Sequence, residues 1–525
     1  MPFVADLKSL RLWKFPALGA GSGPLLGLLL LSLWIKSALV WKLGGYSPDS
    51  ALYIAAASHF EAGSWAAGFA VYPLPVLSLL LALLHRCLGS WEAAAYLCSV
   101  VPAVLTLVPI YRLTTDLFDR RAAFWAAAAF ALSPYLNKFG AELIRDPLFL
   151  FCFTWAVALA ARFLITESKL SLLGCMIMFW ASLLFRIDGV YLFPVLPVLL
   201  LGLAWVQPRR RAGLMKAALL WVGLPMIVLA AVAWLFPDQW LAVTQGDFIT
   251  RRLRDLLSLR FLDHYRAIYQ GLTNLEAADQ GWAGGLFPEM ARHYLLVLYG
   301  LLLIEYFLRL LFVPYALPLA VGLWMPGHER ARWLPPAAAF GFGLVSYLYL
   351  LQEGWIAKRY LSLLVVLATP YVGRGMVALL EAASRSRWLR AVAMAAVAGF
   401  FLLPLWASAG LALENADSAL RPAGQWIAAQ KSWRSAKIYS TDNRVLLYAG
   451  RIADIPTWES HGDLKAPLRS IHDSKKLVLV VVETENRSFQ DTLSDLKNFS
   501  EARYFKGRHR RVMVLCRPGA GGVPE

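Results

Sequence analysis

The sequence has few charged residues for its length. Only 16% of its 525 residues are charged, whereas 59% are hydrophobic, and the mean hydropathy is +0.54. A water-soluble domain seldom has this balance. Apolar runs long enough to cross roughly 30 Å of hydrocarbon recur along most of the chain. The composition therefore excludes an ordinary soluble protein and indicates an integral membrane protein with many spans.

Cysteine is also scarce. The chain has five cysteines, four of them lie in or beside apolar segments, and no two form a CxxC motif. Neither a disulfide framework nor a metal-ligand spacing can be built from them. We therefore expect the cysteines to be small core residues and expect no metal site made from them.

Acidic residues are outnumbered by basic ones. The chain has 51 Lys and Arg but 34 Asp and Glu, a net charge of +17. Much of this positive charge lies in short loops between apolar runs, where it indicates topology and contact with lipid headgroups. No basic stretch is interleaved with stacking aromatic residues, so nucleic acid is disfavoured as a partner and membrane lipids are favoured.

The distribution of positive charge predicts how the chain crosses the membrane. Lys8, Arg11 and Lys14 precede the first apolar run, so the N-terminus is expected in the cytoplasm and the first span is expected to exit near Gly44. No small-residue cleavage site clearly follows this run, so we expect a retained span rather than a signal peptide. About eleven spans are expected, at 24–40, 91–111, 122–137, 147–164, 170–185, 190–206, 217–236, 293–324, 337–351, 361–377 and 391–408.

Two segments between the spans are expected to lie along the outer surface. The apolar run 73–88 is short and interrupted by Pro75, which favours an interfacial helix. The stretch 237–292 contains amphipathic pieces typical of helices on lipid headgroups.

The composition changes after Gly410. A helix, a strand and a helix are expected first, and "KKLVLVVVETEN" and "RRVMVLCRPG" are expected to form two further strands. We therefore predict a transmembrane domain, residues 1–410, and a small extracytoplasmic α/β domain, residues 411–525. No internal repeat is evident, which disfavours an inverted-repeat transporter.

Ionisable residues collect on the predicted outer side. Such groups are costly at membrane depth unless they are paired or functional. For any one residue, snorkelling or a local salt bridge is the simpler explanation. Their convergence from four separate loops favours a polar cavity that opens outward. The residues are Asp49, His59, Lys138, Glu142, Arg145, Asp146, Arg186, Asp188, Lys358 and Arg359.

Helix capping is the competing role for the two aspartates. Asp49 stands just before an apolar-periodic run, as a helix N-cap would, although Ser47 or Ser50 could cap that helix instead. Asp146 precedes Pro147, and Asp-Pro commonly begins a helix. Capping and function both stay open for Asp146.

The order of short motifs resembles a known superfamily. "PDSALYIAAASHF" is followed by "YPLPVLSLLLAL", "LFDRR", "AELIRDPLFLF" and, late in the chain, "KRYLSLLVVLATP". This order resembles the GT-C superfamily of polyprenyl-phosphate-dependent glycosyltransferases, and most of all the branch of the lipid A aminoarabinose transferase and the protein O-mannosyltransferases. The resemblance implies a donor sugar on a polyprenyl phosphate such as undecaprenyl phosphate. It also implies a lipid, glycan or protein acceptor and a site on the periplasmic face of a bacterial inner membrane.

The resemblance also assigns roles to residues. The first-loop acid of the superfamily falls on Asp49, as general base, and the second-loop acid falls on Asp146, as a second catalytic residue that positions the acceptor or supports the site. The late basic-aromatic pair falls on Arg359 and Tyr360. The chain departs from the pattern at Ser50, where many members have a second acid. It departs again at the "VYPLP" that contains Tyr72, where the aminoarabinose branch has a Lys-Pro pair that contacts donor phosphate.

Chemistry supports this assignment independently of the resemblance. Displacement of a lipid phosphate from an anomeric carbon leaves an anion, which cationic side chains must stabilise. A single base opposite the leaving group implies inversion, and the arginines make a cofactor unnecessary, although a divalent metal stays an open alternative. The candidate cations are Lys138, Arg145, Arg186, Lys358, Arg359, Arg251, Arg252 and Arg254, and Glu142, Tyr72, His59 and Tyr360 complete the candidate substrate-binding residues.

Two other functions remain as alternatives. A transporter or flippase of lipid-linked sugars would need polar groups near the middle of the membrane, where Glu305 and Arg309 are expected to pair with each other. An O-antigen-ligase-like transferase, using a diphosphate-linked glycan, would favour a large outer loop, which residues 237–292 partly fit.

Overall fold

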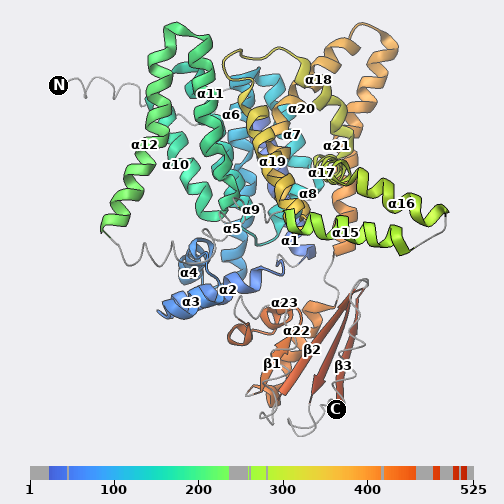
Figure 1. Ribbon diagram of the computed structural model, residues 1–525. Helices are drawn as coiled ribbons and strands as arrows, with labels where there is room; N and C mark the ends of the chain where they lie inside the picture. The colour runs from blue at the N-terminus through green and yellow to red at the C-terminus, as the bar shows by residue number, and fades with distance from the viewer. Residues whose placement is uncertain are drawn as a thin grey trace.

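The computed structural model is a bundle of long helices with a small sheet next to one end (Figure 1). It describes residues 23–43, 46–235, 258, 262–278, 282–415, 419–434, 436–456, 477–484, 500–507 and 510–516. We call the end next to the sheet, where α2 (Ser50–Glu61), α3 (Trp65–Val71) and α4 (Val76–Leu88) also lie, the sheet end. The opposite end, where α11 (Leu192–Val206) and α12 (Arg211–Leu235) join, is the far end.

Within the described residues, seven helical segments are long and apolar enough to cross a membrane. An eighth crossing would combine the end of α16 (Trp282–His293) with α17 (Leu295–Leu311), which meet at 73°. A multi-pass helical membrane protein is therefore confirmed. The seven segments are α1 (Gly23–Leu43), α5 and α6 (Trp91–Leu117), α9 (Asp146–Thr166), 189–206, α19 (Leu334–Glu353), 358–383 with α20 (Ser362–Ala383), and α21 (Arg387–Asn415).

Three of the predicted spans are helices that do not belong to these seven. The segments are α7 (Arg120–Leu132), α10 (Lys169–Phe185) and α12, of which α7 has 13 residues and α10 has 17. Ser133 ends α7, and Pro134 begins the separate short helix α8 (Pro134–Ala141). The predicted bent crossing at 293–324 is likewise divided, because α17 ends at Leu311 and α18 covers Ala316–Trp324. The total of eleven spans stays a prediction.

Helix α20 is the centre of the bundle, and glycines let its neighbours approach it closely. A Cβ atom on Gly375 would collide with the backbone carbonyl of Pro318 in α18, and one on Gly322 would collide with that of Tyr371 in α20. Small residues allow this direct backbone packing, which in hydrocarbon takes the place of a hydrophobic driving force. The core around α20 fixes the loop that precedes it, where Arg359 lies.

A buried lysine fixes α8 against α1. Lys36 is fully buried, and its Nζ donates to Ser32 Oγ at 2.8 Å and to Asn137 Oδ1 at 2.7 Å. The lysine stem packs on Gly140, where a Cβ would lie 2.8 Å from Lys36 Cε. Because α8 leads directly into the segment with Asp146, these contacts hold the second predicted outer loop in place.

The C-terminal region forms a four-stranded sheet in the order β1-β2-β4-β3. Strand β1 (Lys437–Ser440) is parallel to β2 (Leu477–Thr484), whereas β4 (Arg510–Cys516) is antiparallel to both β2 and β3 (Ser500–Lys506). The two predicted late strands are β2 and β4. Helices α22 (Leu420–Ala429) and α23 (Asn443–Tyr448) belong to the same hydrophobic core as α2 and α4.

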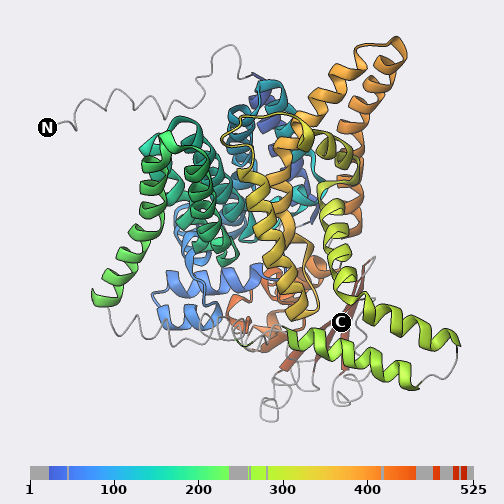
Figure 2. The same ribbon diagram turned by 45° about the horizontal axis from the view of Figure 1, so that its top comes forward.

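The sheet region therefore packs directly on the first predicted outer loop. The ring centroids of Tyr46 and Tyr448 lie 5.6 Å apart. Tyr46 stands three residues before Asp49 in the sequence. Burial raises the pKa of Tyr46 far above its ordinary value, with the neighbouring Glu92 contributing in the same direction. Figure 2 shows α2 and α3 beside the sheet in a second orientation.

Candidate active site

The first predicted outer loop is tied to the second by two serines. The backbone N–H of Ser47 donates to Ser50 Oγ at 2.7 Å, and the hydroxyls of Ser47 and Ser50 donate to the carbonyl of Leu143 at 3.1 and 2.8 Å. These bonds begin α2 without help from Asp49, whose side chain makes no capping hydrogen bond. The capping alternative for Asp49 therefore does not hold.

The Asp49 carboxylate pairs instead with an arginine 310 residues away. Arg359 Nη2 donates to Asp49 Oδ2 at 2.7 Å, and both side chains are 26% exposed. Arg359 lies in the 3₁₀ turn η6 (Lys358–Leu361), which begins the segment with α20. A charge-assisted pair of this kind holds both groups in place, and their partial exposure leaves them accessible.

Asp146 forms a second pair, with Arg186. Asp146 is the first residue of α9, directly after the N-cap residue Arg145, and its Oδ1 accepts a hydrogen bond from Arg186 Nη1. Both side chains are only 6% exposed. Burial of a charge requires such a partner, because a lone buried ion is strongly destabilising. The structure thus gives Asp146 a pairing role rather than a capping role.

One aromatic ring joins the two pairs. The Arg186 guanidinium lies 4.7 Å from the centroid of the Tyr360 ring, and the Arg359 guanidinium lies 5.5 Å from it. Phe149 covers Arg186 from another side, at 5.5 Å. We call Asp49, Arg359, Tyr360, Arg186 and Asp146 the double-pair cluster. Four segments that are distant in the sequence build it.

A cation and two tyrosines flank this cluster. Arg145 lies 5.6 Å from the centroid of the Tyr72 ring, and the Tyr53 and Tyr72 rings meet edge to face at 4.9 Å. Burial raises the pKa of Tyr53 and of Tyr72, so both hydroxyls stay protonated and can donate hydrogen bonds. Tyr53 was not predicted as a site residue, because its surroundings "SALYIAAA" are those of a core position.

The other candidates lie further out. The Lys358 ammonium lies 5.4 Å from the ring centroids of both Tyr135 and Tyr306, on the side of η6 toward α8 and α17. Lys138 is in the last turn of α8, and Glu142 is its C-cap.

His59 lies apart from the cluster. It is in the last turn of α2, ten residues after Asp49, and a helix rises about 15 Å over that length. Arg251, Arg252 and Arg254 fall outside the described residues.

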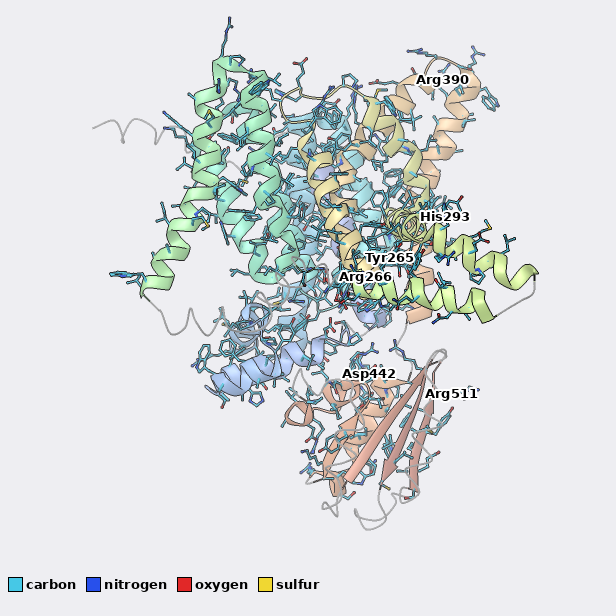
Figure 3. The ribbon with its side chains drawn as sticks, in the orientation of Figure 1. Tyr265, Arg266, His293, Arg390, Asp442 and Arg511 are labelled. Atoms are coloured by element: carbon cyan, nitrogen blue, oxygen red, sulfur yellow. The ribbon has the colours of Figure 1, made fainter. Side chains whose placement is uncertain are left out.

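The distribution of charged residues between the two ends of the bundle agrees with the predicted membrane topology. The turn between α11 and α12, with Arg209, Arg210 and Arg211, lies at the far end, whereas α2 begins at the sheet end (Figure 1). Arg390 near the start of α21 and Asp442 of the sheet region also lie at opposite ends (Figure 3). Among the described residues, no group of three or more His, Cys, Asp or Glu residues could hold a metal ion.

Comparisons with known proteins identify relatives of this architecture. Residues 72–236 match the dolichyl-phosphate-mannose-protein mannosyltransferase family. A search of curated proteins finds no match.

Two solved structures share the fold across most of the chain. ArnT from Cupriavidus metallidurans bound to undecaprenyl phosphate is similar at 12% identity and a TM-score of 0.57, with 96% of this chain and 100% of that chain covered. The Archaeoglobus fulgidus oligosaccharyltransferase tethered with an acceptor peptide is similar at 13% identity and a TM-score of 0.52, with 88% and 69% covered.

The family match begins at Tyr72, beside the double-pair cluster, and it includes Asp146 and Arg186. The likeness to solved structures shows that the whole architecture is shared, although the sequences have diverged widely. The match over residues 72–236 and the shared fold both agree with the resemblance that the order of motifs indicated.

Proposed function

We propose that the chain is an inverting glycosyltransferase that moves a sugar from a polyprenyl-phosphate-linked donor to a hydroxyl of a lipid, glycan or protein acceptor. The observation that carries the proposal is the Asp49–Arg359 pair beside the Asp146–Arg186 pair. A base and several fixed cations in one place are what this reaction requires.

The arginines supply the positive charge that the leaving group needs. When the bond from the anomeric carbon to the phosphate oxygen breaks, negative charge builds up on that oxygen. The guanidinium groups of Arg359 and Arg186 both lie against the Tyr360 ring, and Arg145 adds a third guanidinium near Arg186. ArnT binds undecaprenyl phosphate within the same fold, which supports a polyprenyl phosphate as the donor here.

Arg145 takes the place of a lysine that this chain lacks. The "VYPLP" segment has no basic residue, whereas the aminoarabinose branch has a Lys-Pro pair there. Arg145 stacks over Tyr72 of that same segment, at 5.6 Å from the ring centroid. It therefore brings a positive charge to the same segment from the second loop, and Tyr72 and Tyr53 add neutral hydroxyl donors.

Donor binding and base activation are coupled in this proposal. In the free protein, Arg359 Nη2 donates a hydrogen bond to Asp49 Oδ2, so this oxygen is already occupied. A donor phosphate competes for Arg359 and releases Asp49 toward the acceptor. The acceptor oxygen then attacks the anomeric carbon, its proton passes to Asp49, and the lipid phosphate leaves from the opposite side with inversion.

The remaining assignments complete the proposal. Lys138, Glu142 and Lys358, around α8 and η6, contact the substrates, and Asp146 positions Arg186. His59 contacts the acceptor far from the reacting bond. Residues 1–410 form an eleven-span catalytic domain in a bacterial inner membrane, with the sheet end in the periplasm, and residues 411–525 form a periplasmic α/β domain that packs on it.

A comparison of cell envelopes tests the proposal. Cells that lack this protein, cells with the natural chain and cells with Asp49→Asn would be compared by mass spectrometry of their glycolipids and glycopolymers. We expect one sugar modification that is present only with the natural chain. Identical envelopes in all three strains, with the protein confirmed in the membrane, would contradict the proposal.

A further inference from the structure

A pocket at the far end has no role in the proposed reaction. It has a volume of about 750 Å³, within the size range of small-molecule sites. Four helices, α1, α6 (Leu107–Leu117), α7 and α20, contribute to it. Its lining residues include Arg120, Arg121, Phe124, Trp125, Glu381 and Ser384.

The walls of the pocket are apolar and firmly supported. Phe124 and Trp125 come from α7, and Val377 and Leu380 come from α20. The centroid of the Trp125 ring lies 5.1 Å from that of the Phe400 ring in α21, so this contact with α21 holds the Trp125 ring in place. Such walls suit an acyl chain better than a soluble polar ligand.

The polar residues of the lining are two arginines, a glutamate and a serine. Arg120 and Arg121 are exposed, and within the described part of the chain no ion pair joins either of them to an acid. Their neighbour Asp119 is already engaged, since its carboxylate accepts from the Ala122 N–H at 2.8 Å and lies 3.5 Å from Arg374 Nη1. Two arginines against Glu381 leave the lining with an excess of one positive charge.

The pocket is at the opposite end of the bundle from the double-pair cluster. It includes Ser384, between the end of α20 and the start of α21, and Arg390 of α21 is labelled at the far end in Figure 3. The donor that reacts at the sheet end has its phosphate there, so a ligand at the far end is a different molecule.

We propose that this pocket binds an anionic glycerophospholipid. The phosphodiester contacts Arg120 and Arg121, a headgroup hydroxyl donates to Glu381, and an acyl chain lies along Trp125, Val377 and Leu380. Charge complementarity selects the occupant, because an uncharged or zwitterionic headgroup would leave the positive excess unbalanced. Each arginine near an anionic lipid strengthens binding about five-fold.

The test uses the full chain, purified and placed in nanodiscs that contain phosphatidylglycerol and phosphatidylethanolamine in equal amounts. Lipids retained after extraction into detergent are counted by native mass spectrometry. We expect the natural chain to retain phosphatidylglycerol about 25-fold over phosphatidylethanolamine, and Arg120→Gln with Arg121→Gln to abolish this preference. Arg209→Gln with Arg211→Gln, which removes two exposed arginines from the same end outside the pocket, should keep the preference.

A second variant tests the pocket itself. Ser384 is exposed, so Ser384→Trp fills the cavity without disturbing the core, and it should abolish retention while both arginines remain. Equal retention of both lipids by the natural chain would overturn the proposal, as would a preference that survives either pocket variant. Displacement of phosphatidylglycerol by equimolar undecaprenyl phosphate would overturn it as well, since the pocket would then be a donor site.

Discussion

Asp49→Asn should lower catalytic turnover strongly while it changes stability little. Asparagine keeps the size of the side chain and an oxygen that can accept the Arg359 hydrogen bond, but it has neither negative charge nor basicity. Loss of a general base typically lowers turnover by about 10²- to 10⁴-fold. On the scale of activation free energies this is roughly 3 to 5 kcal/mol.

The structure predicts a much smaller effect of this substitution on folding. Asp49 and Arg359 are each about a quarter exposed, and partly solvated ion pairs contribute about 1 kcal/mol or less. Asp49 caps no helix, because the turn before α2 is held by Ser47 and Ser50. The expected loss of activity therefore exceeds the expected loss of stability several-fold in free energy.

The assay measures release of polyprenyl phosphate from a polyprenyl-phosphate sugar by the purified chain with an envelope extract as acceptor. Thermal unfolding is recorded on the same preparations. Asp263→Asn is the matched control, because Asp263 also pairs with an arginine, Arg266 at 3.1 Å, but is 60% exposed on α15 (Asp263–Ala278). Turnover of Asp49→Asn within about three-fold of the natural chain would refute the base assignment. So would a loss of turnover that simply follows the loss of folded protein.

Three further predictions concern other contacts. Arg359→Ala should raise the KM for the polyprenyl-phosphate donor at least ten-fold, roughly the effect of one charge-assisted hydrogen bond. A KM for the donor equal to that of the natural chain would show that Arg359 does not bind the phosphate. Asp146→Asn should destabilise the protein by about 3–5 kcal/mol, because it leaves the buried Arg186 guanidinium without its carboxylate, and an unchanged melting temperature would contradict this. Gly375→Ala should prevent α18 from packing on α20 and lower the yield of folded protein, whereas Gly343→Ala, with no atom within 4 Å of its Cβ, should be tolerated; equal yields would contradict the packing argument.

Much of the architecture follows from composition and charge, whereas helix breaks do not. Long apolar runs and arginine-rich loops were enough to predict a multi-pass bundle and a sheet region after Gly410. They were not enough at 122–137, where Ser133 and Pro134 divide an apolar run into α7 and α8. An apolar run indicates only that a segment as a whole lies in apolar surroundings. The break at Ser133 and Pro134 depends instead on the backbone conformations that proline allows.

The candidate site was predicted residue by residue but not pair by pair. Asp49, Asp146, Arg186 and Arg359 were each singled out as costly charges, yet a single sequence does not show that Asp49 pairs with Arg359 across 310 positions. That pairing depends on how α20 and the first loop pack. Tyr53 was missed, because it lies on an apolar stretch, and only tertiary packing places its ring against Tyr72.

The most direct test of the central claim is an experimental structure of this chain with undecaprenyl phosphate bound. The account predicts that the phosphate lies within hydrogen-bond distance of Arg359 and Arg145 at the sheet end, and that the Arg359–Asp49 contact is broken. A phosphate bound elsewhere, for example beside Arg120 and Arg121 at the far end, with the Arg359–Asp49 pair intact, would contradict it.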